Sequence, residues 1–134
     1  MIIHDKDCFL LDLDGTLLDL KFDHKFWFEH VVLCFSQKEK IEFEDAKNTL
    51  SELYKNERGT LKWYCTDYWS EKLGLDLKRI TETYMNDIQD FEGTHTFLAN
   101  LQSMKKTIII VSNAHRDTIN IKLTKTKLWG YFDD

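Results

Sequence analysis

The chain has 134 residues, 43% of them hydrophobic and 31% charged, and a formal net charge of −5 at pH 7. This composition predicts one folded domain, or a small core that carries an insertion. The acidic balance excludes a nonspecific nucleic-acid-binding protein, which needs a basic face. No apolar run is long enough to span a membrane, so we expect a cytoplasmic protein without a membrane partner. Its three cysteines are widely spaced and include no CxxC pair, which favours reduced thiols.

Two apolar runs, residues 8–13 and 106–111, predict buried parallel strands. Amphipathic patterns between them predict four helices, over residues 23–36, 43–54, 60–73 and 76–90. A fifth helix is expected to begin with Thr94 as its N-cap, and a sixth to cover residues 115–128. A single helix is enough to connect two parallel strands by a right-handed crossover, so the first four helices indicate an insertion. We therefore predict an α/β core from residues 1–19 and 92–134, and an all-helical module from residues 20–91.

Polar side chains stand where each predicted strand ends. Asp12 lies inside an apolar run, although a buried carboxylate is costly unless a positive group lies beside it. Asp12 and Asp14 fall on the same face of an extended chain, and Gly15 allows a sharp turn and the close approach of a ligand. Ser112 and Asn113 follow the second strand. Because ligands of open α/β sheets bind at the carboxyl ends of the strands, these residues form a candidate site.

This set of residues suits phosphoryl transfer. Asp12 could act as the nucleophile, Asp14 as the general acid and base, and Ser112 as a donor to a phosphoryl oxygen. The helix after Asn113 offers backbone N–H groups to an anion, and carboxylate and carbonyl oxygens suit Mg²⁺. The alternative is structural, because Asp-Gly is a common hairpin-turn signal and on that dipeptide alone the turn is favoured.

The stretch "FLLDLDGTLLDL" resembles the first motif of the haloacid dehalogenase-like hydrolase superfamily, and "IIIVSN" resembles its second motif. Three stretches, "LLDLDGTLLDLKFDHKFW", "LKWYCTDYWSEKLGLDL" and "SNAH", are similar to the bacterial GMP/IMP nucleotidase branch of that superfamily. The resemblance implies a Rossmann-like core with a helical cap. It also implies Mg²⁺-dependent hydrolysis of a purine nucleoside 5′-monophosphate through an aspartyl-phosphate.

Under this resemblance, Asp12 is the nucleophile and Asp14 the acid and base, and both are metal ligands. The residues expected to bind the substrate phosphate are Gly15, Thr16, Ser112 and Asn113.

Cap aromatics would close over the nucleoside under the same resemblance, although packing inside the cap is the favoured interpretation for them. The aromatic residues in question are Phe26, Trp27, Tyr64 and Trp69. Other polar side chains receive structural interpretations: Asp19 and Asp23 as solvated or helix-capping, His30 as a packing residue, and His115 as exposed near a helix start.

The sequence departs from the family pattern after the second motif. The family also has a third-motif lysine and a fourth-motif acidic pair, and we assign neither here. The lysines of the last predicted helix, Lys122, Lys125 and Lys127, and the terminal Asp133 and Asp134 are not counted for these roles. The chain therefore looks C-terminally incomplete, and the exposed edge of a partial sheet would invite self-association.

Two alternative functions stay open. One is a catalytically silent chain that binds a metal ion or a partner without turnover. The other is a dehalogenase, which Asp14 disfavours because cleavage of a carbon–halogen bond needs no proton donor there.

Overall fold

The structure, a computed structural model, describes residues 3–134. Within these residues, β1 (Cys8–Leu11) and β2 (Thr107–Ile110) form a parallel pair with Phe9 opposite Ile108. Phe9 and Ile108 are buried, whereas Leu10 is 66% exposed. The prediction of parallel strands is confirmed, but the prediction of burial on both faces is wrong. Successive side chains of a strand point to opposite faces, and in residues 3–134 only one of these faces is well covered.

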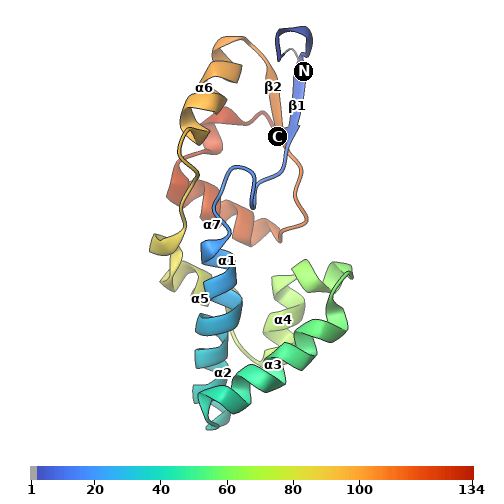
Figure 1. Ribbon diagram of the computed structural model, residues 1–134, viewed down its shortest axis with the longest axis vertical. Helices are drawn as coiled ribbons and strands as arrows, with labels where there is room; N and C mark the ends of the chain where they lie inside the picture. The colour runs from blue at the N-terminus through green and yellow to red at the C-terminus, as the bar shows by residue number, and fades with distance from the viewer. Residues whose placement is uncertain (1–2) are drawn as a thin grey trace.

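Each of the six predicted helical regions contains a helix, but the region predicted over residues 76–90 is helical only to Thr83, followed by a 3₁₀ turn, Met85–Asp87. The helices are α1 (Lys21–Lys25), α2 (Val31–Glu39), α3 (Phe43–Glu57), α4 (Thr66–Leu73), α5 (Leu77–Thr83), α6 (Thr94–Ser103) and α7 (Arg116–Thr126). Figure 1 shows an elongated molecule, with the strands and α6 at one end, α7 across the middle, and α2 and α3 at the other end. None of the helices within residues 3–134 has the length and apolar character needed to cross a membrane.

The first predicted helix is interrupted by a π-helical turn, Phe26–His30, which joins α1 to α2 without a break in the helical path. Phe22 and Phe26 on this rod are buried. His30 is a packing residue, as predicted, since its ring stacks on Tyr84 at 3.5 Å between centroids. The predicted helix over residues 60–73 divides into a 3₁₀ turn, Leu61–Tyr64, and α4.

An aromatic cluster holds the helices between β1 and α6 together. Trp69 is fully buried, and its ring contacts Tyr54 at 5.1 Å and Trp27 at 6.2 Å between centroids. Two buried polar groups are satisfied there, because Trp69 Nε1 donates to the Trp63 carbonyl at 3.1 Å and the Tyr54 hydroxyl donates to the Trp27 carbonyl at 3.1 Å. The cluster is therefore a specific packing arrangement.

The two ends of the helical segment (residues 20–91) lie side by side. The Asp19 N–H donates to the Gln89 carbonyl at 2.9 Å, and the Phe91 N–H donates to the Leu17 carbonyl at 3.0 Å. Thr94 Oγ1 also donates to the Leu17 carbonyl, at 2.9 Å. The expectation that Thr94 is the N-cap of α6 is wrong by one residue, because Gly93 occupies that position and frees the hydroxyl for this contact.

The last residues lie along the outer edge of β2. The Asp133 N–H donates to the Ile108 carbonyl, and the Ile110 N–H donates to the Asp134 carbonyl, both at 2.8 Å. The Asp133 carboxylate accepts the Ile108 N–H at 2.8 Å. This side chain is therefore engaged in pairing at the edge of the sheet. The three cysteines have free thiols.

Candidate functional site

The loop after β1 presents two carboxylates on either side of a buried leucine. Leu13 is fully buried, Asp12 is exposed, and the Asp14 side chain is 23% exposed. Asp12 Oδ1 accepts the Leu13 N–H at 2.8 Å, and Gly15 turns the chain with a φ of 79°. The hairpin alternative is wrong, because β1 pairs in parallel with β2 across the sheet.

A buried lysine joins Asp14 to the helical segment. The Lys122 ammonium donates to Asp14 Oδ1 and to Asp23 Oδ1, both at 2.6 Å, and its side chain is 1% exposed. Asp23 comes from α1 and Lys122 from α7, so three parts of the chain meet at this nitrogen. Hydrogen bonds between charged groups at this length are strong.

The expectation that Asp23 is solvated or helix-capping is wrong. Its side chain is 27% exposed, and its Oδ2 is buried without a hydrogen-bond partner among the described residues. Burial raises the pKa of Asp23 above its usual value, and the Lys122 charge offsets part of that rise. By contrast Asp19 Oδ1 accepts the N–H of Lys21, the first residue of α1, at 2.9 Å, although the N-cap position itself is held by Leu20.

The end of β2 faces a different hollow. Ser112 Oγ accepts the Ala114 N–H at 3.1 Å, and Asn113 is exposed. Ser112 lines a pocket of about 510 Å³ together with Arg116 and Asp133, whereas Asp14 lines another pocket. The structure thus brings Asp12, Asp14, Gly15 and Thr16 together in one loop, with Gly15 and Thr16 exposed, and leaves Ser112 and Asn113 on a neighbouring loop.

The pocket beside Asp14 has a volume of about 380 Å³ and lies between the loop after β1, the helical segment and the start of α7. Its lining includes the connected charged residues Asp14, Asp23 and Lys122. Its aromatic walls are Trp27, Phe28, Trp63 and Tyr64, and its remaining lining residues are Leu20, His24, Thr66, Ala114, His115 and Thr118.

The four aromatic residues singled out in the sequence divide between this pocket and the core. Trp27 and Tyr64 line the pocket. Phe26 and Trp69 are buried in the core, at 4% and 0% exposure, so a direct contact of these two with a ligand is excluded in this arrangement.

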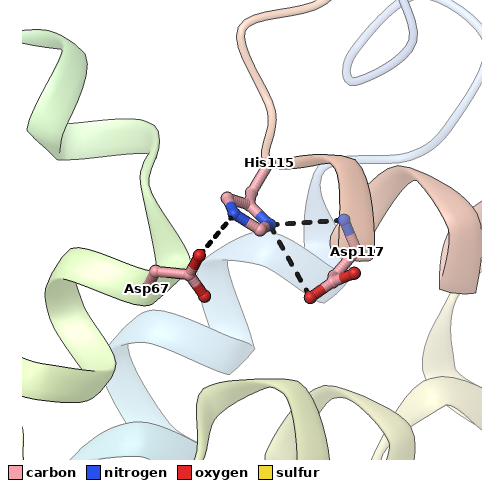
Figure 2. A group of neighbouring side chains, drawn as sticks. All are labelled: Asp67, His115 and Asp117. Carbon is pink, nitrogen blue, oxygen red and sulfur yellow. Dashed lines mark hydrogen bonds and ion pairs between the residues drawn. The ribbon is translucent and has the colours of Figure 1, made fainter.

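A second polar contact joins α4 to α7 at the rim of the pocket. Figure 2 shows the imidazole of His115 between Asp67 and Asp117. His115 Nε2 lies 3.1 Å from Asp67 Oδ2, and His115 Nδ1 accepts the Asp117 N–H at 3.3 Å as the N-cap of α7. The prediction that His115 lies near a helix start is confirmed, but its side chain is only 22% exposed because it packs against α4.

These three side chains offer ligand atoms within 4.8 Å of one another. However, Asp67 approaches one ring nitrogen and Asp117 the other, and the two nitrogens of an imidazole point in different directions. An ion bound at Nε2 would lie near Asp67 but away from Asp117, and an ion bound at Nδ1 would lie near Asp117 but away from Asp67. Binding by all three side chains would therefore require one aspartate to move to the other side of the ring. We interpret the group as a hydrogen-bonded contact between helices.

The sequence of residues 9–134 matches the family model described as "Haloacid dehalogenase-like hydrolase". The chain belongs to this family. It is 39% identical over 129 residues to the GMP/IMP nucleotidase YrfG of Escherichia coli (strain K12), an alignment that covers 96% of this chain and 58% of that protein. The chain therefore spans little more than half the length of the curated relatives it matches.

Solved structures share the fold. The HAD phosphatase from Thermococcus onnurineus aligns with a TM-score of 0.82 at 23% identity, over 95% of this chain and 60% of that one. The L-2-haloacid dehalogenase from Xanthobacter autotrophicus aligns with a TM-score of 0.50 at 17% identity, over 96% of this chain and 55% of that one. The predicted α/β fold of this family is thereby confirmed.

Sequence reasoning missed Lys122 as part of the site. It assigned the residue to the helix after Asn113, which is correct, and gave it no further role. A signal was present, because Lys122 stands at the buried positions of α7 with Leu123 and Thr126. A charged residue on the buried stripe of a helix needs a partner of opposite charge.

Proposed function

We propose that the protein is a phosphomonoester hydrolase whose substrate is a purine nucleoside 5′-monophosphate, GMP or IMP. The observation that carries the proposal is the pocket of about 380 Å³, whose lining combines Asp14 with four aromatic side chains. Its volume lies in the range of small-molecule sites, and flat aromatic walls suit a nucleobase. Identity of 39% to a GMP/IMP nucleotidase supports the same substrate class.

In this proposal, the Asp12 carboxylate attacks phosphorus, and the ester P–O bond breaks as Asp14 gives its proton to the leaving oxygen. Water then attacks the aspartyl-phosphate, with Asp14 as the base, which restores the Asp12 carboxylate and releases phosphate. Lys122 engages Asp14 Oδ1, so the proton is carried by the other oxygen. The residues proposed to contact the phosphate are Gly15, Thr16, Ser112 and Asn113.

Magnesium is the proposed cofactor, and the carboxylate and carbonyl oxygens of the loop are suitable ligands. Asp12 is exposed and uses one oxygen to accept the Leu13 N–H, which leaves the carboxylate open to a hard cation. Asp14 would contribute its backbone carbonyl oxygen, because Lys122 engages Oδ1 and the proposed proton is carried by Oδ2. When bound, Mg²⁺ would neutralise phosphoryl charge.

The helical segment is proposed to act as a cap over a core made of residues 1–19 and 92–134. The adjacent ends of the segment, joined by the Asp19–Gln89 and Phe91–Leu17 hydrogen bonds, support an inserted module.

Self-association through a sheet edge also stays a prediction. Since residues 133–134 already pair with β2, the edge of β1 is the better candidate.

The test is Mg²⁺-dependent phosphate release from IMP and GMP by the 134-residue chain, with Asp12→Asn as the matched control. Release that depends on Mg²⁺ and is lost in the control would support the proposal. Absence of release from both nucleotides, with Mg²⁺ binding retained, would favour the silent alternative. Release of halide from a 2-haloacid instead of phosphate from a nucleotide would favour the dehalogenase.

A further inference from the structure

Lys122 is the most deeply buried charged side chain of the described residues. Its ammonium has the carboxylates of Asp14 and Asp23 on two sides at 2.6 Å, and the ring of Phe22 at 5.8 Å. One carboxylate belongs to the loop after β1 and the other to α1. The lysine therefore connects the loop that carries Asp14 with the first helix of the helical segment.

We propose that Lys122 and Asp23 are positioning residues that fix the Asp14 carboxylate in the wall of the pocket. This proposal rests on the proposed function, in which Asp14 handles the proton. The backbone around Asp14 is fixed by turn hydrogen bonds, such as Gly15 N–H to the Leu18 carbonyl at 2.8 Å. Those bonds leave the side chain free to rotate, and the bond from Lys122 to Oδ1 selects one orientation. The second oxygen of Asp14 is then free to hold or accept a proton.

Asp23 fixes the position of the Lys122 ammonium by accepting a second hydrogen bond from it. With Asp14 alone, a lysine on a flexible stem would follow the carboxylate wherever it turned. A second acceptor at the same distance, on α1, holds the ammonium in place. Within residues 3–134, Oδ2 of Asp23 has no hydrogen-bond partner, and its Oδ1 accepts from Lys122. A purely structural role would be served as well by apolar residues of similar volume.

The contact between His115 and Asp67 is a natural comparison. It also joins the helical segment to α7, at 3.1 Å, but it does not touch Asp14. If contacts between these elements mattered only for stability, breaking either one would have the same kind of effect. The positioning role predicts different effects, because only the Lys122 contact reaches the proposed proton donor.

The first experiment measures steady-state hydrolysis of IMP with Mg²⁺ by the full chain and its variants. Lys122→Met should lower kcat at least tenfold with KM changed less than threefold, since the proton donor is misplaced while the aromatic walls remain. Asp23→Ala should do the same, and Asp23→Asn, which keeps an acceptor oxygen for the lysine, should recover most of the loss. Asp67→Asn should keep kcat within twofold. Equal losses in Lys122→Met and Asp67→Asn would overturn the proposal, as would a wild-type kcat in Lys122→Met.

The second experiment does not depend on turnover. A buried ammonium with two carboxylate acceptors exchanges its protons slowly, so the Lys122 side-chain ¹⁵N–¹H signal should be sharp at pH 7 and absent in Lys122→Met. It should shift or broaden in both Asp14→Asn and Asp23→Asn, and stay unchanged in Asp67→Asn. A signal that does not respond to Asp14→Asn would overturn the proposal even if the chain hydrolyses IMP. If the chain releases no phosphate, the proposed function fails and this signal alone decides whether Lys122 holds Asp14.

Discussion

Replacing Lys122 by methionine keeps most of the volume of the side chain and removes its charge. Two carboxylates would then face each other without a cation, each less than one third exposed, at 23% for Asp14 and 27% for Asp23. Removal of one partner from a buried ion pair typically destabilises a protein by about 3–5 kcal/mol. Partial solvent access of both acids reduces this, so we expect a loss of about 3 kcal/mol at pH 7. For a chain of this length such a loss lowers the thermal midpoint by roughly 10 °C.

The same substitution should change how stability depends on pH. Burial already raises the pKa of Asp23, and Lys122 is the strongest influence that lowers it, so the variant raises this pKa further. A group whose pKa is higher in the folded state stabilises the fold below its unfolded value of 3.8, and that contribution is lost as the pH rises through the folded value. The variant should therefore be least stable relative to the wild type at pH 7, and the difference should shrink as the pH falls toward about 4.

The assay is urea unfolding followed by tryptophan fluorescence at pH 7 and near pH 4, for the wild type and Lys122→Met. Lys125→Met, a partly exposed lysine on the same helix, is the matched control and should change stability by less than about 0.5 kcal/mol. The double variant Lys122→Met with Asp23→Asn should recover part of the loss, because one of the facing charges is gone. Wild-type stability of Lys122→Met at pH 7, or a deficit that grows toward acid pH, would refute the reasoning.

Three other substitutions test separate parts of the molecule. Asp12→Asn should abolish phosphate release and leave the unfolding free energy within about 0.5 kcal/mol, since the side chain is exposed; turnover near that of the wild type would contradict the nucleophile assignment. Trp69→Phe should lower the unfolding free energy by about 2–3 kcal/mol, because it leaves a gap in the core and removes the hydrogen bond to the Trp63 carbonyl. Chemical denaturation measures this loss, with the surface variant Trp129→Phe as the control, and a loss no larger than that of the control would contradict the prediction. Gly74→Ala should cost roughly 1–2 kcal/mol by differential scanning calorimetry, because the residue has a φ of 63° and its new Cβ would meet the Lys38 ammonium; an unchanged midpoint would mean that the end of α4 can move.

Local patterns were sufficient to predict the order of the elements. The β-branched run "TIII" favours a strand and forms β2, and the apolar spacing of residues 43–54 matches the observed α3. Boundaries were less predictable, because they depend on contacts between distant residues. The Thr94 hydroxyl, for example, has a better acceptor in the Leu17 carbonyl than in its own helix, and no local rule contains that carbonyl.

The candidate site was predictable where its residues are close in sequence. Asp12 and Asp14 follow one strand in a motif, and the structure places them in one loop. Lys122 and Asp23 were not predictable as a pair, because the chain between them must fold before they meet. The pairing of a buried lysine with an acid is expected in general, but the choice of Asp23 over other acids depends on the tertiary fold that brings α1 to Lys122.

The π-helical turn at Phe26–His30 sets the rotation about the helix axis between α1 and α2, which it joins into one continuous helical path. Asp23 lies before the turn and reaches Lys122 of α7, and His30, the last residue of the turn, stacks on Tyr84. Each residue of a helix advances the side chains by about 100°, so the loss of one residue within the turn would rotate one end against the other by that angle. Both ends could not then keep their partners. The number of residues in this turn therefore determines whether Asp23 can reach Lys122 while His30 stacks on Tyr84.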